Sequence, residues 1–126
     1  MRCIIKHIVL FLALLIPFST TLSQDKNTTD EKFIKDIIDK FYDDDAYVNG
    51  EAITEVVKYG DNAVQYLIKA LQSENENVRW CSAIALGKIA PEGEKAIPYL
   101  TVTLNDSNSN VRWCSAIALG KFNQAA

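Results

Sequence analysis

An 11-residue sequence occurs twice in this 126-residue chain. Val78–Lys88, which reads Val-Arg-Trp-Cys-Ser-Ala-Ile-Ala-Leu-Gly-Lys, recurs unchanged as Val111–Lys121, so the period is 33 residues. A period of roughly 20–50 residues is typical of stacked supersecondary units, none of which buries its apolar face alone. The repeat therefore predicts a row of similar units in place of one compact core.

Each unit reads as two helices. In the first helix, apolar residues recur at the i, i+3, i+4, i+7 spacing of one helix face. The first set is Val64, Leu67, Ile68 and Leu71, and the matching set is Ile97, Leu100, Thr101 and Leu104, in which a threonine takes one of the four places. Segments 73–77 and 106–110 are rich in Asn and Ser and offer N-caps to the second helices. The second helices carry an apolar stripe at Val78, Cys81, Ser82, Ala85, Leu86 and Ile89, repeated at Val111, Cys114, Ser115, Ala118, Leu119 and Phe122.

Helical spacing continues upstream of the exact repeat. It is carried by Phe33, Ile34, Ile37, Ile38 and Phe41, and by a shorter set at Ala52, Ile53, Val56 and Val57. We interpret residues 31–60 as a degenerate unit before the repeats 61–93 and 94–126. The predicted fold is an all-α solenoid of about three helical hairpins, close to the minimum for a stable stack.

The motif of the second helix, Val-Arg-x-x-x-Ala-x-Ala-Leu-Gly, follows a first helix that contains Ala-Ile-Pro-Tyr-Leu at 96–100. This combination closely resembles the short HEAT-like repeat named after phycobilisome lyases, over residues 62–122. The resemblance implies an α-solenoid that binds other proteins. Some members handle bilin chromophores, and others with His-Glu pairs are metal-dependent hydroxylases.

The first 23 residues have the parts of a secretory signal. Arg2 and Lys6 precede the apolar run Ile8–Phe18, and the small, mainly polar residues 19–23 follow it. An apolar run of this length is too short to span a bilayer, which takes about 20 residues as a helix. We therefore expect a cleaved signal peptide at 1–23 that contacts the membrane transiently during export, a disordered leader at 24–30, and a secreted or periplasmic protein. An uncleaved anchor or a buried first helix is the alternative.

Composition argues against catalysis and against nucleic acid. The single histidine is His7, so the chain after the signal lacks both a His-paired nucleophile and the His-Glu pairs of the hydroxylases. Without the signal, 11 basic and 16 acidic residues leave a net charge of −5, which is unsuited to binding phosphates. The acidic run 43–45 fails the EF-hand spacing, because position 12 counted from Asp45 is Val56. We expect no enzyme, no cofactor and no metal.

Cys81 and Cys114 occupy equivalent positions on the core stripe. Stacked helices lie about 8–10 Å apart, beyond the reach of about 7 Å between Cα atoms that a disulfide allows. We therefore expect two buried free thiols; a disulfide or a bilin-type thiol attachment is the alternative.

The second helices are apolar on both sides, which suggests a binding face opposite the core stripe. The candidate partner-binding residues are Arg79, Trp80, Ile84, Arg112, Trp113 and Ile117. Trp and Arg are enriched at binding hot spots. The alternative is that the Trp rings fill the seam between adjacent repeats.

The last repeat copies the internal one and has no polar outer face, although terminal repeats normally carry one. This suggests self-association, a docked partner or a longer solenoid. The sequence thus predicts an exported, non-catalytic module that binds a protein partner of unknown identity; an accessory subunit resembling the phycobilin lyases is the alternative.

Overall fold

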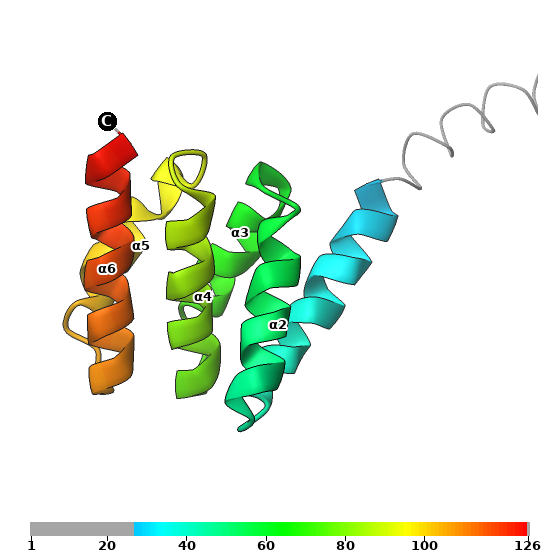
Figure 1. Ribbon diagram of the computed structural model, residues 1–126, viewed down its shortest axis with the longest axis horizontal. Helices are drawn as coiled ribbons and strands as arrows, with labels where there is room; N and C mark the ends of the chain where they lie inside the picture. Colours follow the sequence, from blue (N-terminus) through cyan, green and yellow to red (C-terminus); the bar gives the residue numbers. More distant parts are fainter. Residues whose placement is uncertain (1–26, 126) are drawn as a thin grey trace, which may run out of the picture. The chain divides into compact units, whose positions relative to one another are not determined.

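A computed structural model describes residues 27–125, with side chains described through residue 124 (Figure 1). The chain divides after Phe33 into two units, which are described separately. In the first unit, residues 27–33 are helical; the predicted signal 1–23 lies outside the described residues. Residues 27–30, which we placed in the disordered leader, are thus helical. Apolar spacing gave no sign of this segment because Asn27, Thr28 and Thr29 are polar and exposed.

The second unit is a stack of three helical hairpins, which confirms the predicted all-α solenoid. Residues 34–39 are helical and form the first helix of the first hairpin. The elements in chain order are η1 (Lys40–Tyr42), α2 (Ala46–Val57), α3 (Asp61–Ala70), α4 (Glu76–Ile89), η2 (Glu94–Ala96), α5 (Ile97–Thr103) and α6 (Ser109–Ala125). The second helices α2, α4 and α6 form one row, with α3 and α5 behind it (Figure 1).

The core lies between the two rows of helices and contains most of the residues that the periodicity selected; Phe33, Thr101 and Leu104 are instead exposed. Ile34, Ile37 and Phe41 are buried, and so is every member of the predicted stripe on α4. The corresponding residues of α6 are buried except Leu119, which is partly buried. Removing these side chains from water is the main stabilising contribution to such a stack.

Serine is tolerated in this stripe because its hydroxyl is satisfied within the helix. Ser82 Oγ donates to the Val78 carbonyl oxygen at 2.6 Å, and Ser115 Oγ lies 2.7 Å from the Val111 carbonyl oxygen. Ser115 Oγ also lies 2.6 Å from Thr103 Oγ1 of α5. These bonds avoid the cost of a buried hydroxyl without a partner.

The same turn precedes each second helix. Asp45, Asn75 and Asn108 accept bonds from backbone N–H groups at the start of α2, α4 and α6, as N-caps do. The caps lie 30 and 33 residues apart. The first hairpin is therefore three residues out of phase with the exact repeat, which explains its weak sequence signal. The acidic run 43–45 is the capping turn of α2.

One further bond is common to the three turns. The side chain four residues after each N-cap donates to the carbonyl oxygen of the residue six positions before it. In chain order these bonds are Asn49 Nδ2 to Asp43 (2.9 Å), Arg79 Nη1 to Ser73 (3.0 Å) and Arg112 Nη1 to Asp106 (2.8 Å). Asn49 thus replaces arginine in the degenerate unit, which sequence comparison alone did not reveal.

The seam between α4 and α6 is closed by small residues. Gly87 faces α6, and a Cβ atom placed on it would lie 2.9 Å from Ala118 Cα. Ala83 of α4 is completely buried. Contacts this close require residues without bulky side chains.

Among the described residues, no helix combines the length and the apolar character that crossing a membrane requires.

Candidate partner-binding face

The two tryptophans of the exact repeat have different surroundings. Trp80 of α4 is partly buried against the core, and its Nε1 donates to Asn77 Oδ1 at 3.1 Å. Trp113 of α6 is 67% exposed. The isoleucines follow the same division, because Ile84 is partly buried whereas Ile117 is 44% exposed. Of the six candidate residues, Trp113 and Ile117 are therefore the large apolar side chains open to a partner.

The division follows from position in the stack. α4 packs against both α2 and α6, whereas the matching side of α6 faces no other described element. Ala83 is buried in α4, and its counterpart Ala116 is exposed in α6. An identical sequence therefore gives a seam in one helix and an open face in the next.

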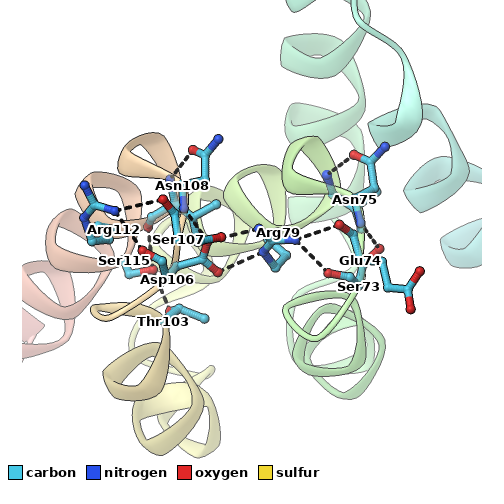
Figure 2. A network of polar contacts seen from close by, with 12 residues as sticks. Ser73, Glu74, Asn75, Arg79, Thr103, Asp106, Ser107, Asn108, Arg112 and Ser115 are labelled. Atoms are coloured by element: carbon cyan, nitrogen blue, oxygen red, sulfur yellow. Dashed lines mark hydrogen bonds and ion pairs between the residues drawn. The ribbon is translucent and has the colours of Figure 1, made fainter.

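Arg79 is fully engaged inside the protein. Its guanidinium forms two bonds with the Asp106 carboxylate, from Nε at 2.8 Å and from Nη2 at 3.0 Å. Nη1 donates to the carbonyl oxygens of Ser73 and Glu74 at 3.0 and 2.9 Å. Figure 2 shows Arg79 between the turn before α4 and the turn before α6. A two-point bond to a carboxylate fixes geometry as well as adding energy, so Arg79 sets the register of neighbouring repeats.

Arg112 makes the equivalent turn contacts but forms no ion pair with a carboxylate among the described residues. Its Nη1 donates to the carbonyl oxygens of Asp106 and Ser107 at 2.8 and 3.1 Å (Figure 2). The side chain is exposed. Of the two candidate arginines, Arg112 is therefore the one whose Nε and Nη2 groups can reach a partner.

The carboxylate of Asp106 interacts electrostatically with both Arg79 and Arg112. Burial raises the pKa of its carboxyl, but bonds from Arg79 and from the Asn108 N–H, with the charges of Arg79 and Arg112, outweigh burial and hold the pKa below the usual 3.8. The side chain is 11% exposed. The Arg79–Asp106 pair is thus mostly shielded from water and less screened than a surface pair.

Acid is expected to weaken this link. Because the folded pKa of Asp106 is depressed, its contribution is present above pH about 4 and is lost as pH falls through the folded pKa. Urea unfolding of the wild type and of Asp106→Asn at pH about 7, 4.5 and 3 measures this effect. We expect a gap in unfolding free energy at pH 7 that narrows as the pH falls below about 4, because the unfolded chain then binds a proton at Asp106 more readily than the folded protein does. A gap independent of pH would show that the charge of Asp106 contributes nothing.

Cys81 and Cys114 are buried and free, as predicted. Burial, and then the neighbouring Cys114, raise the pKa of the Cys81 thiol to about 12. Burial also raises the pKa of Cys114. Reactive cysteines have a lowered pKa and access to solvent, so both thiols act here as small core side chains. In the part of the chain that the structure describes, no group of His, Cys, Asp and Glu could hold a metal ion.

The stacked hairpins and the bond between their turns define an α-solenoid repeat protein. A HEAT repeats family model matches residues 34–102, and a HEAT repeat model matches residues 96–126. The chain belongs to the HEAT repeat family. HEAT repeats commonly mediate protein–protein interaction, and proteins built from them are generally non-catalytic scaffolds. None of the curated proteins compared with the chain matches it.

The six candidate residues do not form one continuous set in the structure. Arg79 is bonded internally, and Trp80 and Ile84 are partly buried. Arg112, Trp113 and Ile117 are all exposed on α6. The sequence could not separate the two triplets because they lie in identical 11-residue segments.

Proposed function

We propose that this HEAT repeat chain is an exported, non-catalytic interaction module that binds a protein partner through its second helices. Trp113 and Ile117 would form the apolar centre of the contact, with the free donors of Arg112 at its edge. Arg79, Trp80 and Ile84 would support this face from within the stack. The observation that carries the proposal is the exposure of Trp113, which is 67% on a helix whose opposite face is buried in the core.

Trp113 offers a partner a large apolar side chain that is already exposed. A Trp side chain has a large apolar surface, and its removal from water makes tryptophan one of the residues most enriched at binding hot spots. Trp113 and Ile117 lie four residues apart on α6, so one partner surface can contact both. The helix is held by the buried side chains beneath it, and binding therefore requires little ordering of the protein.

Export is the second part of the proposal. It rests on the charged start, apolar run and small-residue end of segment 1–23. Intact-mass measurement of the chain recovered from culture supernatant or periplasm would test it. We expect a product that begins after Thr21 or Ser23; an uncleaved chain retained in the membrane would contradict export.

Partner binding is tested by Trp113→Ala. Tagged wild-type and variant chains are purified from the exported fraction, and the co-purifying protein is quantified by mass spectrometry. We expect capture to fall about tenfold or more, because truncation of a central Trp typically costs at least about 2 kcal/mol of binding. The thermal unfolding midpoint should change little, because the side chain is already in water.

Tyr99→Ala supplies the matched control. Tyr99 is an exposed aromatic residue on α5, in the other row of helices, and is 44% exposed. We expect this variant to keep wild-type capture. Equal loss in the two variants, or full capture by Trp113→Ala, would contradict binding through the second helices.

A further inference from the structure

Four residues of α6 form an exposed stripe that the structure leaves without a partner among the described residues. Trp113, Ala116, Ile117 and Gly120 lie at i, i+3, i+4 and i+7, so they share one face of the helix. All four are exposed. We call this set the α6 stripe. Its counterparts in α4 are covered or partly covered by neighbouring helices; they are Trp80, Ala83, Ile84 and Gly87.

The α6 stripe continues an established packing surface. In α4 this face accepts another helix, with Gly87 against Ala118 of α6. In α6, a Cβ atom on Gly120 would meet nothing within 4 Å. Leu104, the C-cap residue of α5, adds to the exposed apolar surface: it is 37% exposed, whereas its counterpart Leu71 is 2% exposed. The open surface is thus built to pack against helices.

The side-chain sizes along the α6 stripe are complementary to those of a second copy that runs antiparallel to it. Read forward, the order is large, small, large, small, and an antiparallel copy reverses it. Trp113 then faces Gly120 of the second copy, and Ala116 faces Ile117. Large side chains opposite small ones allow helices to interdigitate at core density. The symmetry axis of this pairing passes between Ala116 and Ile117.

Head-to-tail stacking of copies fits less well. In the internal seam, Ala118 meets Gly87, and Ala118 lies ten residues after its N-cap, Asn108. The residue ten positions after the cap of α2 is Glu55, which is paired with Lys40 at 3.1 Å. A second copy added by its α2 end would place this carboxylate against the apolar stripe. The Glu55–Lys40 pair is about half exposed, and removing its charges from water against an apolar surface is unfavourable.

We propose that two copies of this chain associate through their α6 stripes, antiparallel about a two-fold axis, with the indole of Trp113 over Gly120 of the other copy. The proposal rests on the proposed function in one respect, because it names a second copy as a partner for the same exposed face. Two-fold pairing also brings the α5 helices of the two copies to the same side, where both Leu104 side chains lie. An interface of one hairpin per copy is small, so a weak, concentration-dependent dimer is expected.

A cysteine near the axis tests the geometry directly. In Ala116→Cys, the two introduced thiols lie close to the two-fold axis, so mild oxidation should give a covalent dimer. Ser109→Cys is the control on the same helix, because a two-fold axis at 116–117 separates its two copies by about 20 Å along the helices. The wild-type chain controls for its native cysteines. Equal crosslinking at both positions, or none at Ala116→Cys, would overturn the proposal.

A size swap tests which residues face each other. Gly120→Trp places two indoles in opposition, and Trp113→Gly leaves two gaps; each is expected to raise the dimer Kd about tenfold or more. The double variant restores large against small and should return the Kd to within about threefold of wild type. Sedimentation from about 1 to 200 μM measures the Kd, and thermal unfolding confirms that each variant is folded. Failure of the double variant to recover association would overturn the proposed pairing.

These outcomes are separable from those for the proposed function. A wild-type chain that stays monomeric at every concentration overturns the second-copy inference. If Trp113→Ala still loses capture of a different protein, the proposed function stands without it. Conversely, full capture by Trp113→Ala together with specific crosslinking of Ala116→Cys would support the dimer and contradict partner binding by the second helices.

Discussion

Replacing Arg79 by alanine is expected to destabilise the fold by about 2–4 kcal/mol, because it leaves the carboxylate of Asp106 without its partner. Asp106 is 11% exposed and depends on two bonds from Arg79, at 2.8 and 3.0 Å. The same change removes the donors to two backbone carbonyl oxygens in the turn before α4. The loss therefore combines an uncompensated charge with unmade hydrogen bonds.

Arg112→Ala is the matched control for this prediction. Arg112 makes the same two turn bonds in the next repeat, but it is exposed and forms no ion pair with a carboxylate in the part of the chain that the structure describes. We expect its loss to cost less than about 1 kcal/mol. Urea unfolding followed by circular dichroism gives both values. Equal costs at Arg79 and Arg112 would show that the bond to Asp106 does not hold neighbouring repeats together.

Replacing Gly87 by alanine is expected to destabilise the fold, whereas Gly120→Ala is expected to stabilise it. Both positions gain about 1 kcal/mol of helix propensity. Only Gly87 meets an obstacle, because the new Cβ would lie 2.9 Å from Ala118 Cα, a backbone atom of the next helix. Overpacking of this kind costs about 1–3 kcal/mol and forces α4 and α6 apart.

The difference in unfolding free energy between the two glycine variants measures the cost of overpacking between α4 and α6, because the gain in helix propensity is common to both. Thermal and urea unfolding at one low protein concentration measure it without a contribution from association. A Gly87→Ala variant as stable as Gly120→Ala would mean that the helices of the seam separate at little cost. It would also weaken the argument that the open face around Gly120 is built for close helix packing.

Much of the fold could be predicted from the sequence. The 33-residue period identified repeats, and helical spacing selected buried residues such as Leu67, Leu86 and Leu100. These signals are local, because a side chain on the inner face of a helix must be apolar wherever the helix lies in the stack. The prediction failed to mark the helical residues 27–30, which are polar and contribute no such pattern.

Prediction of the first hairpin was limited because an asparagine stands there in the place of the repeated arginine. Asn49 makes the turn bond that Arg79 and Arg112 make in the later repeats. An amide and a guanidinium look unrelated in a sequence, yet both place an N–H donor beside the same carbonyl oxygen. Aligning the N-caps Asp45, Asn75 and Asn108 would have revealed the correspondence.

The candidate partner-binding residues show most clearly what could not be predicted from the sequence. Val78–Lys88 and Val111–Lys121 are identical, so the sequence assigned one role to each pair of equivalent residues. The sequence by itself determined that each second helix has two apolar faces, because that depends on spacing within the helix. Only the tertiary structure decided that Trp80 is partly buried against the core whereas Trp113 is exposed. Burial depends on which helix packs alongside, and that neighbour is set by position in the stack, which identical segments cannot encode.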